Sequence, residues 1–327
     1  MLRRRQFFTG ALVAAGLIFV AAVLPLPLYL IAPGSAIDLS DAVTVGSLAP
    51  PRDRFFLTDV QLIRASPLRL AFALFPGVSL TRAELVVPEG VSVRRFGDVM
   101  QDAMTQSQSI AAVVAERAAG LAVQLPLEQV EVEAIDAASA ARGVLAVGDV
   151  IRNIDRLTVR GDADVRAALS AKRPGSAVRI AIDRAGRRRV VTVRTVRIGG
   201  RTRLGIVLAE RYGPAQLAIP VRYTIGDVGG SSGGLMIALR IYGSLHASPA
   251  GAARSFAGTG TIGLDGRIGP IEGTQQKLIA AKRAGARVFF VPRTNYADIA
   301  GERDIRVIPV DTFGQAVRAL VAVPRSP

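Results

Sequence analysis

The chain has 327 residues, of which 50% are hydrophobic and 20% are charged, so it is long enough for about two domains with a sizeable core. It has no cysteine and one histidine, His246, which excludes a disulfide framework, a cysteine nucleophile and metal sites built on thiolates or clustered histidines. The formal net charge is +15. No G-x-x-x-x-G-K-[ST] motif is present, so we expect no P-loop for ATP, no metal and no other cofactor.

A charge-free apolar segment follows three arginines at the N-terminus. Its core, Phe7–Ala32, is about long enough to cross a bilayer as a helix. Arg3–Arg5 before it and Asp38 after it predict a cytoplasmic N-terminus and an extracytoplasmic remainder. The competing interpretation is a signal peptide cleaved near Ser35. We expect residues 1–36 to form a cytoplasmic tip and a transmembrane anchor that contacts membrane lipid, which makes the chain a single-pass plasma-membrane protein.

The next region, residues 37–123, is predicted to be rich in β-structure with one helix. Short apolar runs between Pro/Gly turns indicate strands at Phe55–Leu57, Leu68–Phe75 and Glu84–Val87. Residues 97–120 have a helix-forming composition that ends at a glycine.

Residues 124–203 alternate strands with small-residue turns and one helix. The segments Val130–Ile135, Val178–Ile182 and Val190–Val196 alternate as strands do, and Gly148–Ile151 leads into another strand. This order resembles a PDZ domain, which implies binding of extended peptides by strand addition. A small α+β module without that function is the alternative.

Positive charge is concentrated in residues 151–203, where fourteen Arg and one Lys face four Asp. A surface for anionic lipid or acidic peptides is one interpretation, and a solvated strand face is the other. Few aromatic residues are interleaved with these arginines, so we expect no nucleic-acid partner.

The third region, residues 204–324, contains the glycine cluster Gly229–Gly234 before an apolar helix, Leu235–Tyr242. The cluster lacks the lysine of a phosphate-binding P-loop. It satisfies the G-x-S-x-G pattern around Ser231 and around Ser232, but that hydrolase type also needs an acid and then a histidine after the serine, and no acid separates Ser232 from the only histidine. A flexible turn and a lysine-activated serine remain.

Lys277 is the candidate base for such a serine. The chain has 38 arginines and three lysines, and Lys277 lies among Leu278, Ile279 and Ala280 on a predicted helix that starts near Thr274. Burial disfavours an ammonium ion, and a neutral amine can accept a serine proton. A solvated helix lysine is the alternative, and it is the interpretation that we favour for Lys282.

These residues also resemble a known family. Gly230–Leu235 is similar to the serine motif of the Lon-type protease domain, usually Gly-Pro-Ser-Ala-Gly, and Gly269–Gly273 followed by Lys277 looks like that family's lysine motif. Ala257–Thr261 resembles the strand between them. With Pro33–Ala36 and the PDZ-like region, the order resembles the membrane-anchored, PDZ-containing Lon-like proteases of bacteria.

The resemblance implies a serine endopeptidase with a Ser-Lys dyad that works without ATP. Ser232 would be the nucleophile, Lys277 the general base and Thr259 a partner of the lysine, while the backbone of Gly230, Ser231 and Gly233 would form the oxyanion site.

Ser231 stands where the family usually has Pro, and Gly233 where it has Ala, so the two adjacent serines leave the attacking residue open. Lon-type domains tend to form rings, which is compatible with a homo-oligomer. The expected architecture is multidomain α+β, and the expected partners are protein or peptide substrates. The alternative function is a non-catalytic PDZ scaffold with an inactive protease fold.

Overall fold

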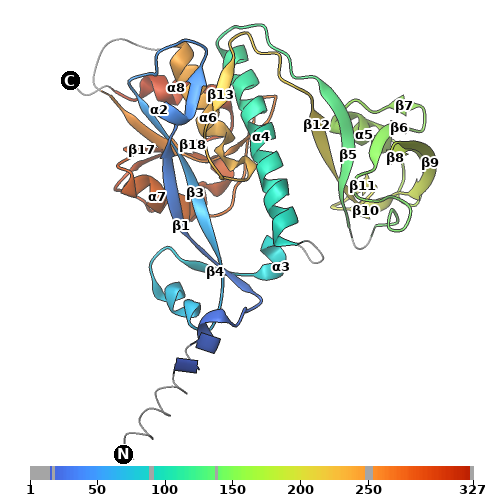
Figure 1. Cartoon of the computed structure of the whole chain (residues 1–327). Coiled ribbons are helices and arrows are strands. Elements are labelled where there is room, and N and C mark those ends of the chain that lie inside the picture. The colour runs from blue at the N-terminus through green and yellow to red at the C-terminus, as the bar shows by residue number, and fades with distance from the viewer. Residues whose placement is uncertain (1–14, 17–18, 88–91, 137–138, 247–252, 325–327) are drawn as a thin grey trace, which may run out of the picture. The chain divides into compact units, whose positions relative to one another are not determined.

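The computed structural model describes residues 15–16, 19–87, 92–136, 139–246 and 253–324. These residues form two compact units (Figure 1). The second unit, Gln124–Gln216, is inserted into the first, which combines the chain before it with the chain after it. Gln124 and Gln216 form an antiparallel bridge, with N–H···O distances of 3.2 and 2.8 Å, so the insert leaves and re-enters the first unit at one point.

The first unit is built on a six-stranded mixed sheet with the order β18-β17-β14-β3-β1-β4. β3 pairs in parallel with β14, β14 with β17, and β17 with β18, whereas β1 pairs antiparallel with β3 and β4. The sheet therefore joins strands from the two regions predicted as separate, 37–123 and 204–324. The strands are β1 (Leu28–Asp38), β3 (Arg54–Arg64), β4 (Ser79–Arg82), β14 (Ser255–Gly258), β17 (Val288–Pro292) and β18 (Arg306–Val310).

Helices and short strands complete this unit. The helices are α2 (Leu39–Ala42), α3 (Ala83–Val86), α4 (Val93–Ala118), α6 (Gly234–Leu245), α7 (Thr274–Arg283) and α8 (Phe313–Ala322). The 3₁₀ turns are η1 (Arg69–Leu74), η2 (Ser231–Gly233) and η3 (Arg293–Ile299). The short strands are β2 (Val43–Val45), β13 (Val221–Tyr223), β15 (Thr261–Ile262) and β16 (Ile268–Gly269).

Alternation along the central strands buries both faces of the sheet. On β3, Phe55 joins the core that includes residues of α4, α6 and α8, whereas its neighbour Phe56 joins the core that includes Leu278 of α7. On β17, Phe290 and Phe289 divide in the same way. Such two-sided burial is typical of parallel strands with helices on both faces. The unit is therefore a three-layer mixed α/β fold.

Two charged side chains that are fully buried connect distant segments. Glu116, near the end of α4, accepts the N–H groups of Ala218 and Ile219 at 2.8 and 3.2 Å, where the chain re-enters the unit. Arg240 of α6 donates to the carbonyls of Leu39, Ser40 and Val43 at 3.0–3.1 Å. Each charge therefore satisfies backbone groups that would otherwise be unpaired in the interior.

The second unit is a small sheet with one helix. The strand order is β12-β5-β6-β8-β9, β7 pairs with β6, and β10 pairs with β11. β12 lies beyond residue 203, where we predicted the PDZ-like region to end, yet it pairs with β5 along its length. The elements are β5 (Leu127–Ile135), β6 (Val150–Ile154), β7 (Leu157–Thr158), α5 (Asp162–Ser170), β8 (Ala177–Arg184), β9 (Arg187–Arg194), β10 (Val196–Ile198), β11 (Arg201–Arg203) and β12 (Ile206–Tyr212).

The prediction of a transmembrane helix over Phe7–Ala32 is wrong. Residues 1–14 and 17–18 lie outside the described residues, and the end of the apolar run belongs to β1, where Leu30 is fully buried in the sheet. In the described part of the chain, no helix has the length and apolar character needed to span a bilayer. The predicted single-pass plasma-membrane topology depended on this helix and is therefore also wrong. The fold class is mixed α/β, without the predicted N-terminal transmembrane helix.

Two local predictions also fail. Leu68–Phe75 and Glu84–Val87 were predicted as strands, but they form η1 and α3. Neither element has a buried residue, so local hydrogen bonding rather than core packing decides their conformation. The helix predicted over 97–120 is confirmed as α4, which starts at Val93. Ser92 caps it, because the Ser92 side chain accepts the N–H of Arg95 at 3.2 Å.

Candidate active site

The glycine–serine cluster forms a tight turn at the start of α6. Gly230 has a φ of +90°, a backbone conformation that side chains with a Cβ rarely adopt. Its N–H donates to the carbonyl of Met100 on α4 at 2.7 Å. A Cβ on the preceding Gly229 would lie 2.7 Å from the Cβ of Met100. Glycine is therefore required here because α4 passes directly against the turn.

Hydrogen bonds from both sides hold the turn. The Ser107 hydroxyl on α4 donates to the carbonyl of Ser231 at 3.1 Å. The carbonyl of Ser232 accepts the N–H of Gly260 at 2.7 Å and the Thr259 hydroxyl at 3.1 Å. The backbone on each side of the two serines is thus fixed, which defines the direction of their side chains.

Lys277 reaches this turn from the first helical turn of α7. Its side chain is 4% exposed. Its Nζ donates to the Ser232 Oγ at 2.7 Å and to the Thr259 Oγ1 at 3.3 Å. The structure therefore brings together Ser232, Lys277 and Thr259, the three residues that the motifs singled out, and it places Ser232 rather than Ser231 in contact with the lysine.

Burial lowers the pKa of Lys277 from 10.5 to about 8. The negative charges of Asp59 and Glu272 act in the opposite direction and raise this pKa. A pKa of about 8 leaves roughly a tenth of the lysine as the neutral amine at pH 7. At neutral pH a minority of Lys277 side chains are therefore neutral amines, which can accept a proton, and the others are ammonium ions.

The backbone amides of the turn are only partly available to an oxyanion. We expected Gly230 among the donors, but its N–H already donates to Met100. Ser231 and Gly233 lie in η2, directly before α6. The first N–H groups of a helix have no intrahelical acceptor and point outward. The backbone between Ser231 and Gly233 is the better candidate for binding a developing negative charge.

A cleft of about 600 Å³ opens in front of Ser232. Its walls come from β3, the first half of α4, the serine turn, Thr261 and the segment before α7. It is lined by Leu57–Val60, Leu62, Phe96, Gly97, Met100, Gln101, Met104, Asp227–Gly233, Thr261, Pro270–Glu272 and Lys277. Within the described residues, no group of three or more His, Asp or Glu side chains is arranged to hold a metal ion.

Three residues of the site were not found from the sequence. Met100 and Ser107 hold the serine turn, and Asp59 acts on the charge of Lys277. No local pattern marks them, because each acts on a residue more than 100 positions away in the chain.

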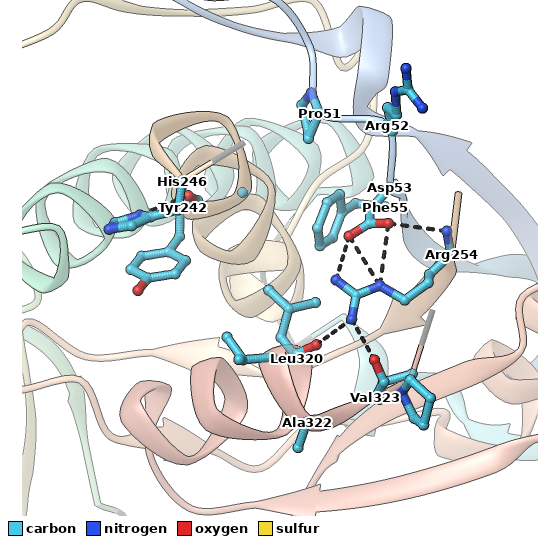
Figure 2. A pocket seen from close by; sticks show the side chains of 13 residues that line it. Pro51, Arg52, Asp53, Phe55, Tyr242, His246, Arg254, Leu320, Ala322 and Val323 are labelled. Carbon is cyan, nitrogen blue, oxygen red and sulfur yellow. Dashed lines mark hydrogen bonds and ion pairs between the residues drawn. The ribbon is translucent and has the colours of Figure 1, made fainter. Parts of the chain in front are cut away.

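A second cavity, of about 400 Å³, lies in the same unit and contains none of these residues (Figure 2). Asp53 and Arg254 form an ion pair at 2.6 Å beside it, and the Arg254 guanidinium also donates to the carbonyls of Leu320 and Val323 at 2.8 and 2.7 Å. Arg254 thus caps the end of α8. His246 stacks on Tyr242 with the ring centres 4.1 Å apart, and it is not among the residues that line the cleft in front of Ser232. The only histidine of the sequence therefore lies outside the candidate site.

The inserted unit has a groove of its own. A cavity of about 750 Å³ lies between α5 and the β11–β12 segment. Its lining combines apolar side chains such as Leu169 and Leu208 with Arg166 and Arg201. β12 is the terminal strand of its sheet, so no described strand pairs with its outer edge.

Two parts of the chain match known protein families. Residues 217–321 match the Lon protease (S16) C-terminal proteolytic domain, and residues 100–195 match the PDZ domain. The chain is 33% identical over 101 residues to the Lon protease of Chloroflexus aggregans, covering 29% of this chain and 12% of that protein. It is 45% identical over 71 residues to the Lon protease of Campylobacter concisus, covering 20% of this chain and 9% of that protein. It is 31% identical over 113 residues to Lon protease 2 of Bacillus subtilis, covering 34% of this chain and 20% of that protein.

The chain therefore spans a fifth or less of the length of these relatives. Among solved structures, the PDZ domain of an SdrC-like protein from Listeria monocytogenes is 22% identical, with a TM-score of 0.25, and covers 26% of this chain and 93% of that one. The sequence matches support a serine peptidase, as the motifs predicted. The chain combines a region of the PDZ domain type with a region of the Lon protease C-terminal proteolytic domain type.

Proposed function

We propose that this chain is a serine endopeptidase that works without ATP, with Ser232 as nucleophile and Lys277 as general base. The observation that carries the proposal is the 2.7 Å contact between the Lys277 Nζ and the Ser232 Oγ, made by a lysine that is 4% exposed. A buried amine with a lowered pKa is the arrangement that activates a serine without histidine. The lowered pKa of Lys277 and the match to the Lon proteolytic domain support the same conclusion.

In the proposed reaction, the neutral Lys277 amine takes the hydroxyl proton as the Ser232 Oγ attacks the carbonyl carbon of the peptide. The negative charge that forms on the carbonyl oxygen is stabilised by N–H groups of the turn between Ser231 and Gly233. The Lys277 ammonium then gives its proton to the leaving amine, and the bond between carbon and nitrogen breaks. Water repeats the sequence on the acyl-enzyme. Thr259 keeps the Nζ in line by accepting one of its hydrogen bonds.

The cleft favours an extended polypeptide as substrate. β14 pairs with β3 only as far as Leu57, whereas β3 continues to Arg64. Beyond Leu57, no described strand pairs with this edge of β3, and Thr58–Val60 and Leu62 line the cleft. A substrate segment added along this edge gains main-chain hydrogen bonds whatever its sequence.

We further propose that the inserted unit recruits substrate by strand addition at β12. The unpaired edge of β12, with the groove against α5 beside it, supports this role. Because Ser232, Lys277 and Thr259 all lie in the first unit, removal of residues 125–215 should mainly slow the cleavage of protein substrates with extended tails. Equal loss on a short peptide would contradict recruitment.

The dyad is tested by three variants and a serine-reactive fluorophosphonate probe. Ser232→Ala should lose peptide cleavage and probe labelling, and Lys277→Arg should lose both because arginine stays charged. Ser231→Ala is the matched control, since it removes the neighbouring hydroxyl that has no contact with Lys277, and it should keep measurable activity. Labelling that survives in Ser232→Ala and disappears in Ser231→Ala would move the nucleophile by one residue. No labelling of the folded wild-type chain would instead support a non-catalytic scaffold.

A further inference from the structure

The charge of the cleft is opposite to the charge of the chain. The chain has a formal net charge of +15 and 38 arginines. Among the described residues that line the cleft in front of Ser232, Lys277 is the only basic one, and Asp59, Asp227 and Glu272 are acidic. The lining therefore carries three carboxylates against one amine, although acidic residues are the minority in the sequence. Such a local reversal of sign favours cationic ligands and raises their concentration in the cleft.

Asp59 is the carboxylate with the most defined position. The β1 strand has a bulge between Pro33 and Ala36, opposite this part of β3. Within the bulge, the backbone N–H and the hydroxyl of Ser35 donate to the two carboxylate oxygens of Asp59 at 2.5 and 3.0 Å. A Cβ on Gly34 would overlap the same carboxylate. The Pro-Gly-Ser-Ala segment therefore forms a fitted seat for the Asp59 side chain.

The seat leaves Asp59 with capacity for a further partner. An ionised carboxylate has about four acceptor positions, and Ser35 uses two of them. Asp59 forms no ion pair with any described residue. Asp53, which directly precedes β3, is instead paired with Arg254. Asp59 is thus a half-buried carboxylate that is held in place and lines the cleft. Among the described residues that line the cleft, Lys277 is the one with the opposite charge.

The position of Asp59 on β3 places it beside the edge along which a substrate would bind. Thr58, the residue before it, donates to the carbonyl of Gly258, the last residue of β14, at 3.0 Å. Asp59 therefore lies at the point where the edge of β3 becomes unpaired and the cleft begins. It is also close enough to Lys277 for its charge to raise the pKa of that lysine. Suppose that a substrate segment adds along this edge of β3. The substrate residue whose side chain points toward Asp59 then lies near the scissile bond.

We propose that Asp59 is a specificity-determining residue that binds a lysine or arginine side chain of the substrate beside the scissile bond, so that the cleft takes basic polypeptide segments. Asp227 and Glu272, which are exposed at the rim, add to the attraction without a fixed geometry. The inference rests on the proposed function, because it takes the bound polypeptide to be a substrate. The preference for binding basic segments does not itself require cleavage.

The test compares three quenched fluorescent peptides that differ at one position next to the cleaved bond, with Arg, Gln or Glu. Wild-type protein should show kcat/KM in the order Arg, Gln, Glu, with about tenfold between Arg and Gln. In Asp59→Asn the ratio of kcat/KM for the Arg peptide to that for the Gln peptide should fall to near one. A ratio within one variant cancels any effect of Asp59 on the pKa of Lys277, because both peptides meet the same lysine.

Asp304→Asn is the matched control, because it removes an exposed carboxylate that does not line the cleft, and its ratio should stay at the wild-type value. The same peptides, uncleaved, are also bound to Ser232→Ala with and without Asp59→Asn and followed by fluorescence anisotropy. Asp59→Asn should reduce the preference for Arg over Gln in Kd about tenfold.

Equal cleavage of the three peptides by wild-type protein, or an unchanged Arg/Gln ratio in folded Asp59→Asn, overturns the inference and leaves the peptidase proposal intact. Absence of any cleavage, with the Kd preference for Arg present and lost in Asp59→Asn, supports the inference while the peptidase proposal fails. A loss of preference in Asp304→Asn as large as in Asp59→Asn would show that the total charge of the chain, and not Asp59, is responsible.

Discussion

Replacing Lys277 with methionine should abolish peptide cleavage and at the same time make the fold more stable. Methionine has a similar length and no charge, so it fills the space of the buried lysine without its ammonium group. The lysine is 4% exposed, and burial lowers its pKa from 10.5 to about 8. The lowered pKa means that the folded chain holds the ammonium at a cost in free energy.

The size of this cost follows from the pKa. Each pKa unit corresponds to about 1.4 kcal/mol, so the cost of burying the protonated lysine is about 3 kcal/mol at pH 7. It is complete below the folded pKa of about 8, decreases as the pH rises from 8 toward 10.5, and is absent above the unfolded pKa. At pH 9.5 it is about 1.5 kcal/mol. The hydrogen bonds to Ser232 and Thr259 that methionine removes are worth about 1 kcal/mol each and reduce the gain.

The assay is urea unfolding, followed by far-ultraviolet circular dichroism, of wild-type chain and Lys277→Met at pH 7 and pH 9.5. We expect the variant to be more stable by about 1 kcal/mol at pH 7 and the difference to shift by about 2 kcal/mol toward the wild type at pH 9.5. Lys282→Met is the control. Lys282 lies on the same helix, but the hydrogen bonds that its ammonium donates to Asp304 and Glu302 raise its pKa, so the effect of Lys282→Met should not change between these two pH values. A difference for Lys277→Met that is independent of pH would refute the reasoning.

Four further predictions concern the same unit. The rate of peptide cleavage should rise about tenfold per pH unit below pH 8 and level off above it, because Lys277 must lose its proton; a flat profile from pH 6 to 9 would contradict this. Thr259→Val should lower kcat about tenfold and shift the profile to lower pH, since the lysine loses an acceptor that favours its charged form. Ser107→Ala should lower kcat several-fold with little change in KM, because the carbonyl of Ser231 loses its donor. Glu116→Gln should lower the free energy of unfolding by about 1–3 kcal/mol in urea titrations, because an amide has one acceptor oxygen for two buried N–H groups; an unchanged midpoint would count against it.

The pair of candidate catalytic residues could be predicted from the sequence because its signals are local. A serine among glycines before an apolar helix and a rare lysine beside small apolar residues are each visible within a few positions, and the resemblance to the Lon-type protease domain then assigned their roles. The structure places their side chains 2.7 Å apart, although 45 residues separate them. Their roles in catalysis stay a prediction until variants are measured.

The surroundings of the site could not be predicted, because they depend on contacts between distant segments. Ser107 lies 124 residues from Ser231, and β3 pairs with β14 about 200 residues away. From the sequence alone, a fragment of residues 204–327 is expected to keep its fold, because Ser232, Lys277 and Thr259 all lie within it, but the pairing of β3 with β14 changes this expectation. That fragment lacks β3 and α4, so it loses a central strand of its sheet and one wall of the cleft, and we expect it not to fold.

The N-terminal error has a similar cause. An apolar run has the same composition whether it faces lipid or a protein core, and only pairing distinguishes the two. The end of the run belongs to β1, which pairs with β3 and β4. Composition alone carries no information about this pairing.

The division of the sheet between the two ends of the chain has a consequence for the order of synthesis. β3 and α4 leave the ribosome early, whereas the serine turn, Thr259 and Lys277 follow only after the whole inserted unit. The strand β14, which pairs with β3, and the lysine that contacts the serine are therefore absent from any nascent chain that ends before Ser255. A chain that ends before α7 contains the inserted unit and part of the cleft lining, but it lacks the contact between Lys277 and Ser232. The topology thus makes the contact between Ser232 and Lys277 one of the last parts of this unit that can form during synthesis.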